Sequence, residues 1–150
     1  MPKNLEASIE IAASPAQVWS VLTDLGRISE FSPTTRKMIA LGGVRTGTFT
    51  LNINKDGWKI WPTTSRIVRF EPNQVFAFQM NENRTVWSYE LEPTATGTRV
   101  TESRVVAPKG VPAPVRGMIN VALGGEQQFE ANLVSGMRET LARVKAAAER

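Results

Sequence analysis

Four side chains carry groups that could take part in proton transfer or charge stabilisation: Glu126, Glu102, Tyr89 and Arg66. The 150-residue chain has no histidine and no cysteine. This composition excludes an imidazole general base, a Ser-His triad, a thiolate nucleophile, His- or Cys-ligated zinc and any disulfide framework. No spacing of acidic residues resembles a calcium or magnesium site, and no glycine-rich phosphate loop is present. We therefore predict a protein without metal or cofactor, whose acid–base chemistry would depend on a carboxyl or phenol group.

Glu126 lies in an apolar stripe. If residues 115–149 form one continuous helix, Glu126 falls within about 20° of the centre of that stripe, counting 100° per residue. A buried carboxyl there would have a raised pKa and could act as a general acid or base, or anchor a polar ligand group. Gly124 and Gly125 precede it, and they could reset the helical phase or restart the helix. We favour this alternative, in which Glu126 faces solvent.

Glu102 and Arg104 share one face of a predicted strand with Val100, and Arg66 completes this second group of charged candidates. If that face points inward, a charged pair lies at one end of the protein interior. If it points outward, the two side chains form a screened surface pair that contributes little to stability. We favour the outward orientation.

The segment "RTVWSYELEP" alternates with a period of two, so Trp87, Tyr89 and Leu91 share one face and Ser88 and Glu90 the other. This pattern predicts a half-buried strand. The two rings could fill a solid core, or they could line a hollow that holds a ligand. The pattern alone leaves both possibilities open, although a buried tyrosine hydroxyl requires a partner.

Periodicity and turn residues predict one α+β domain over residues 1–150. Ser14 is a plausible N-cap, followed by Pro15 at the first helical position and by Gln17, which completes a capping box. Pro62 indicates an edge position or a bulge in its strand. The predicted strands are 5–11, 35–41, 47–54, 58–70, 74–81, 84–93 and 98–106, and the predicted helices are 14–24, 25–31 and 115–149. Consecutive hairpins make the sheet antiparallel, and the long last helix is the only large element available to cover it.

Charge and hydropathy limit the classes of partner that the protein is expected to bind. Lys+Arg minus Asp+Glu is 18 − 14, or +4, and the basic residues form no stripe, so nucleic acid is not indicated. The start "MPKNLEASIE" lacks an apolar signal core, and no apolar run reaches 18 residues. We expect a cytoplasmic protein without stable membrane insertion. Monomer and homodimer both remain open.

Four segments carry a resemblance to a known family: "SPAQVWSVLTDLGRISEFSP", "WPTTSRIVRFEPNQVFAF", "WSYELEPTATGTRVTESR" and "FEANLVSGMRETLARVKAAAE". Together they resemble the polyketide cyclase/dehydrase and lipid-transport family of the START-like, helix-grip SRPBCC superfamily. The resemblance implies a curved sheet of six to seven strands around the C-terminal helix, with a cavity between them. The residues expected to line that cavity and bind a ligand are Phe49, Leu51, Phe78, Met80, Trp87, Tyr89, Met118, Phe129 and Leu133.

Three functions fit these features. The leading interpretation is a non-enzymatic protein that binds a hydrophobic small molecule, lipid- or polyketide-like, because aromatic and Met side chains make an adaptable apolar wall. The second is a cofactor-free aromatase/cyclase-type enzyme that uses Glu126, Glu102, Tyr89 or Arg66. The third is a protein-interaction or regulatory module with a collapsed cavity. The same fold supports all three, so the fold alone does not decide between them.

Overall fold

The computed structural model describes residues 4–82, 84–106 and 126–149; for 126–130 it describes the backbone alone. Its centre is a seven-stranded antiparallel sheet with the strand order β1-β7-β6-β5-β4-β3-β2. The strands are β1 (Leu5–Ile11), β2 (Thr35–Ala40), β3 (Phe49–Asp56), β4 (Lys59–Glu71), β5 (Val75–Met80), β6 (Val86–Pro93) and β7 (Thr98–Val105). The described helices are α1 (Pro15–Leu22), the 3-10 turn η1 (Leu25–Arg27), α2 (Ile28–Phe31) and α4 (Glu126–Ala148).

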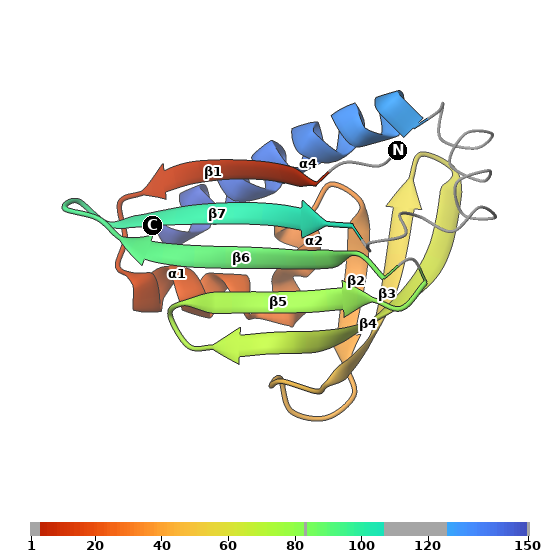
Figure 1. The fold of residues 1–150 in the computed structure, drawn as a ribbon, viewed down its shortest axis with the longest axis horizontal. Helices are drawn as coiled ribbons and strands as arrows, with labels where there is room; N and C mark the ends of the chain where they lie inside the picture. Colours follow the sequence, from red (N-terminus) through yellow and green to blue (C-terminus); the bar gives the residue numbers. More distant parts are fainter. Residues whose placement is uncertain (1–3, 83, 107–125, 150) are drawn as a thin grey trace.

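The sheet curls around its helices. In Figure 1, β2 and β3 run steeply across the direction of β1, β7, β6 and β5, and β4 bends from one direction to the other. The helices α1, α2 and α4 lie on the side toward which the sheet curls. The predicted α+β helix-grip architecture, with two short helices after the first strand, is therefore confirmed.

The start of α1 follows the predicted signal only in part. The Ser14 Oγ accepts a hydrogen bond from the Gln17 backbone N–H at 3.2 Å, and Pro15 occupies the first turn. The Gln17 side chain does not complete a capping box. Its Nε2 instead donates to the Ala148 carbonyl oxygen at 2.7 Å, so it joins the start of α1 to the last turn of α4.

Pro62 lies where β4 has one strand neighbour. It is in register with Ile53 of β3, whereas pairing with β5 begins only at Ser65. The edge position predicted from Pro62 is therefore correct locally, although β4 is a central strand over the rest of its length. A separate register shift in the β4–β5 pairing lies between Ile67 and Arg69.

Gly97 closes the turn between β6 and β7 against the chain that follows β1. A Cβ added there would lie 2.0 Å from the Ile11 carbonyl oxygen, a distance that no real contact allows. Only glycine permits this close approach of two backbones. The turn and the Thr98 hydroxyl, which donates to the Ala13 carbonyl at 2.7 Å, together fix β7 beside β1.

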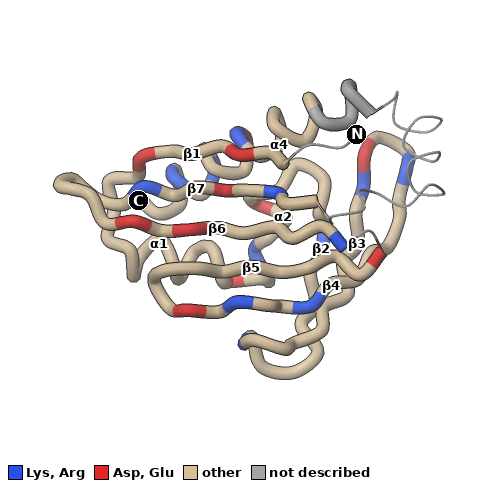
Figure 2. Tube along the Cα trace, viewed as in Figure 1, with Lys and Arg blue, Asp and Glu red and all other residues tan. Residues whose placement is uncertain are grey.

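Basic and acidic residues are mixed along the described part of the chain. Figure 2 shows Lys and Arg interspersed with Asp and Glu along the strands and α4. Within the described ranges, no helix combines the length and the apolar character needed to cross a bilayer.

Candidate functional site

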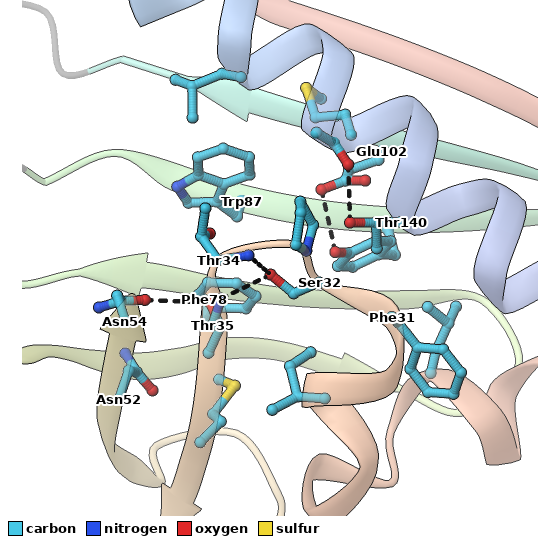
Figure 3. A pocket seen from close by; sticks show the side chains of 18 of the residues that line it. Phe31, Ser32, Thr34, Thr35, Asn52, Asn54, Phe78, Trp87, Glu102 and Thr140 are labelled. Carbon is cyan, nitrogen blue, oxygen red and sulfur yellow. Dashed lines mark hydrogen bonds between the residues drawn. The ribbon is translucent and has the colours of Figure 1, made fainter. Parts of the chain in front are cut away.

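A cavity of about 230 Å³ lies between the sheet, the η1–α2 segment and α4. The described residues that line it from the strands are Thr35, Met38, Asn52, Asn54, Thr63, Phe76, Phe78, Met80, Trp87, Tyr89 and Glu102. Those from the helices and their connections are Leu22, Leu25, Ile28, Phe31, Ser32, Pro33, Thr34, Asn132, Leu133, Gly136, Met137, Thr140 and Val144. Figure 3 shows Asn52 and Asn54 at one end and Glu102 and Thr140 at the other, with Trp87 and Phe78 between them.

The two rings of the β6 pattern have different surroundings. Tyr89 is buried and stacks on Phe76, with ring centroids 6.5 Å apart. Phe76 also contacts the Trp19 and Phe70 rings edge-on, at 6.4 and 6.0 Å, so Tyr89 packs against an aromatic cluster, and Tyr89 and Phe76 both also border the cavity. Trp87 is half-buried and borders the cavity. Both rings therefore border the cavity, and Tyr89 belongs to the packed core as well.

Five of the residues expected to line the cavity do so: Phe78, Met80, Trp87, Tyr89 and Leu133. Phe49 and Leu51 do not, and Leu51 is 37% exposed on the outer face of β3. The expectation for these two residues is therefore wrong. Met118 lies outside the described residues, and so does the side chain of Phe129.

The face of β3 that points inward is polar. Asn54 Nδ2 donates to the Trp61 carbonyl at 3.2 Å and to the Thr63 Oγ1 at 3.0 Å, and its Oδ1 accepts from the Thr35 hydroxyl at 3.1 Å. Asn52 also takes part in hydrogen bonds between side chains on this face. Its Oδ1 accepts from the Thr50 hydroxyl at 3.0 Å. These internal bonds allow an amide-bearing face to be buried, and this is the reason that hydrophobic periodicity selected the wrong face.

Glu102 and Arg104 face inward, each only 3% exposed, which corrects the expected outward orientation. The β6–β7 register contains the physical reason. Tyr89 lies directly opposite Glu102, and Trp87 opposite Arg104. Residues directly opposite each other in an antiparallel pair share a face, so the inward position of the two rings brings the two charged side chains inward as well.

Glu102 forms a buried pair with Tyr89. The Tyr89 hydroxyl donates to the Glu102 Oε2 at 3.1 Å. Burial raises the pKa of the Glu102 carboxyl to about 8, and the hydrogen bond from Tyr89 opposes this rise. Burial, followed by the adjacent Glu102 charge, raises the Tyr89 pKa well above its ordinary value. At neutral pH the carboxyl is therefore mostly protonated and the phenol remains a neutral donor.

The other two candidates do not join this pair. Arg66 lies exposed on β4, in register with Phe49 and Gln79 on the outer face of the sheet, so the expected grouping with Glu102 is not formed. Glu126 is the first described residue of α4, but its side chain lies outside the description. Among the described residues, no cluster of three or more His, Cys, Asp or Glu could hold a metal ion.

Residues 2–149 match the family described as polyketide cyclase / dehydrase and lipid transport. The chain belongs to this family. A search of curated proteins found no match.

Solved structures with the same fold include two aromatase/cyclases. The di-domain aromatase/cyclase StfQ of the steffimycin pathway is similar with a TM-score of 0.79 and 14% identity; the alignment covers 97% of this chain and 50% of StfQ. The Zhui aromatase/cyclase of Streptomyces sp. R1128 has a TM-score of 0.76 and 19% identity, with 99% and 94% coverage. This chain therefore spans half of the di-domain protein, and these two likenesses show the fold alone.

A further similar structure is the polyketide-cyclase-like protein Cgl2372 of Corynebacterium glutamicum. It is 29% identical, with a TM-score of 0.64 and coverage of 97% of this chain and 91% of that protein.

Sequence reasoning missed several cavity residues of this family member. Asn52, Asn54, Thr35 and Thr63 were not candidates, because polar residues on a strand usually indicate its solvent face. One available signal was the register of the predicted β3–β4 hairpin. It places Asn52 opposite Thr63, and Thr50 opposite Ser65, which forms a continuous set of groups able to bond to each other.

Proposed function

We propose that this protein binds a compact hydrophobic small molecule in the cavity between the sheet and α4. The observation that carries the proposal is the cavity itself, whose wall includes Phe78, Met80, Trp87, Leu133 and Met137. Rigid rings and flexible methionine side chains on facing elements suit a ligand with a large apolar surface.

The size of the cavity limits the ligand. Its volume of about 230 Å³ is smaller than the roughly 300–1,000 Å³ of cavities that bind drug-sized molecules. We therefore expect the part of the ligand held inside this cavity to be one or two rings, or a short chain. A cavity of this size also argues against the module with a collapsed cavity.

Native mass spectrometry of the protein isolated from its own host tests the proposal, with a bound small molecule as the expected result. A cavity-filling variant makes the test specific. Gly136 lines the cavity on α4, and a Cβ there would meet only the Pro33 Cγ at 3.5 Å. Gly136→Leu should fold and lose the bound molecule. Ser135→Leu, exposed on the same helix, should keep it. Retention of the molecule by Gly136→Leu would place it elsewhere and contradict the proposal.

A second candidate function, aromatase/cyclase-type catalysis, is favoured by one observation: a hydrogen-bonded carboxyl–phenol pair borders the cavity. A carboxyl with a pKa near 8 can give up and take back a proton at neutral pH. If the protein is such an enzyme, Glu102→Gln should lower the rate roughly 10²–10⁴-fold. A binding protein should keep its ligand in the same variant.

A further inference from the structure

The turn between β3 and β4 exposes a tryptophan. Gly57 and Trp58 form its two-residue loop, and Asp56 pairs with Lys59 on either side of them. Gly57 has a φ of 63°, in the left-handed region that glycine adopts without strain. Turn positions usually carry small or polar residues. Trp58 is nevertheless 86% exposed, so packing in the core does not explain its presence.

Apolar side chains continue from Trp58 along the outer face of the sheet. Ile60 is 67% exposed and lies directly opposite Lys55. Ile53 is half-buried and lies opposite Lys37. Residues opposite each other share a face, as do residues two apart on one strand, so these strand residues form one surface beside the turn. We call this surface the hairpin patch; it consists of Ile53, Trp58, Ile60, Lys37, Lys55 and Lys59.

The positive charge of the protein is concentrated in these strands. Although basic and acidic residues are mixed along the chain as a whole, residues 35–66 contain six Lys or Arg and one Asp, a net charge of 6 − 1, or +5. The whole chain carries +4, so the remaining residues sum to 4 − 5, or −1. Glu82 adds one acid beside β4, where its carboxylate accepts from the Thr64 backbone N–H at 2.8 Å. Figure 2 shows the basic positions on β2, β3 and β4.

The composition of the hairpin patch favours one class of partner. Nucleic-acid interfaces are polar, so three exposed or half-exposed apolar side chains do not suit them. A specific protein interface buries roughly 1,200–2,000 Å², whereas a hairpin tip offers few side chains. The boundary between lipid headgroups and acyl chains needs only a few. Tryptophan is enriched at that boundary, and lysine reaches anionic headgroups from an apolar surface.

We propose that the hairpin patch docks the protein on the surface of an anionic phospholipid bilayer. The Trp58 and Ile60 side chains lie at the boundary between headgroups and acyl chains, and the three lysines of the patch lie among the headgroups. The contact is peripheral, and it does not depend on what the cavity binds. Since β3 and β4 continue from the patch into the cavity wall through Asn54 and Thr63, docking holds that end of the cavity beside the lipid.

Co-sedimentation with vesicles tests the proposal. One vesicle population contains about 70% phosphatidylcholine and 30% phosphatidylglycerol, and the other contains phosphatidylcholine alone. At low salt the wild type should bind the anionic vesicles at least about 10-fold more tightly than the neutral ones, because each lysine near an anionic surface contributes about fivefold. Raising the salt from about 0.05 to 0.5 M should remove most of this preference, since it screens the lysine charges.

Matched variants locate the contact. Trp58→Ala should weaken binding to anionic vesicles by about 10-fold or more, because a tryptophan carries a large apolar area into the bilayer. Its thermal unfolding should match the wild type, since the side chain is exposed. Val68→Ala, farther along β4 and also exposed, should bind as the wild type. Lys55→Glu should weaken binding about 5- to 25-fold. Arg138→Glu makes the same charge change on the exposed face of α4 and should have little effect.

Each contrary result overturns the proposal. Equal binding of the wild type to both vesicle populations would exclude an anionic surface as the partner. Unchanged binding by Trp58→Ala, or an equal loss in Lys55→Glu and Arg138→Glu, would show attraction by net charge alone. Light scattering that finds a wild-type dimer and a monomeric Trp58→Ala would assign the hairpin patch to contact with a second copy of the chain. The cavity-binding function is unaffected by any of these outcomes.

Discussion

The two ends of the cavity bury polar side chains in opposite ways. At the β3–β4 end, the amides and hydroxyls bond to each other and to a backbone carbonyl. At the β6–β7 end, Glu102 has one partner for two oxygens among the described residues. The first arrangement is complete without a ligand and serves the fold. The second leaves one buried carboxyl oxygen without a partner among the described residues, so the two ends differ in how fully their buried polar groups are satisfied.

The largest expected effect is the pH dependence of the free energy of unfolding that comes from Glu102, at the β6–β7 end of the cavity. The folded state holds the Glu102 proton up to about pH 8, whereas the unfolded chain releases it near 4.5. Stability from this group is therefore fully present below about pH 4.5 and is lost as pH rises to about 8, by roughly 1.4 kcal/mol per pH unit. Urea unfolding at pH 5 and pH 9 should show wild type losing on the order of 4 kcal/mol relative to Glu102→Gln. Parallel pH profiles would contradict a buried, neutral Glu102.

At the β3–β4 end of the cavity, the loss of any one of the hydrogen-bonded side chains should destabilise the fold. Asn54→Leu removes the partner of the Thr35 and Thr63 hydroxyls and of the Trp61 carbonyl. We expect a cost of about 2–3 kcal/mol, because buried polar atoms lose their partners. Chemical denaturation measures this cost. A free energy of unfolding near that of the wild type would mean that water replaces the Asn54 amide in these hydrogen bonds.

Tyr89→Phe should refine the comparison with a smaller effect. It removes the one described donor to Glu102 and should cost about 1–2 kcal/mol at pH 6. It should also raise the pKa of Glu102 further, because the Tyr89 hydrogen bond lowers it. An NMR titration of the Glu102 carboxyl carbon measures this shift. A fall in the pKa would show that another group controls the carboxyl.

The smallest effect is expected for a substitution that lies away from the cavity. Leu51→Thr changes a residue on the outer face of β3, so unfolding free energy should change by no more than about 0.5 kcal/mol. Native mass spectrometry should find the same bound small molecule on this variant as on the wild type. Loss of that molecule would restore Leu51 to the cavity wall and reverse the assignment of the faces of β3.

The sequence predicted the fold well because most of its signals are local. Ser14 with Pro15 marked the start of α1, and the alternation around Trp87 marked β6. The site was predicted in part. Phe78, Met80 and Trp87 were found because aromatic and Met side chains on inner strands signal a buried face. Other residues depended on which face becomes concave, and that is a tertiary property.

The inward-pointing faces of β3 and β7 were predicted wrongly for the same reason. Hydrophobic periodicity assigns the apolar face of a strand to the interior, but Asn52 and Glu102 lie inside because cross-strand partners support them. Pairing register carries that information. For β7 the turn ending at Gly97 aligns Pro93 with Thr98 and therefore Tyr89 with Glu102, so the inward position of Glu102 followed from that of Tyr89.

The pairing of β1 with β7 has a consequence for the order of folding. Leu5 aligns with Arg104, and Gln17 bonds to the Ala148 carbonyl 131 residues later. The hairpins from β3 to β7 close over short loops and can form early, but β1 and α4 join only when nearly the whole chain is present. During synthesis at about 5–20 residues per second, β1 waits several seconds for its partner. Pulsed hydrogen exchange during refolding should protect β4–β6 amides before those of β1, and simultaneous protection would exclude this order.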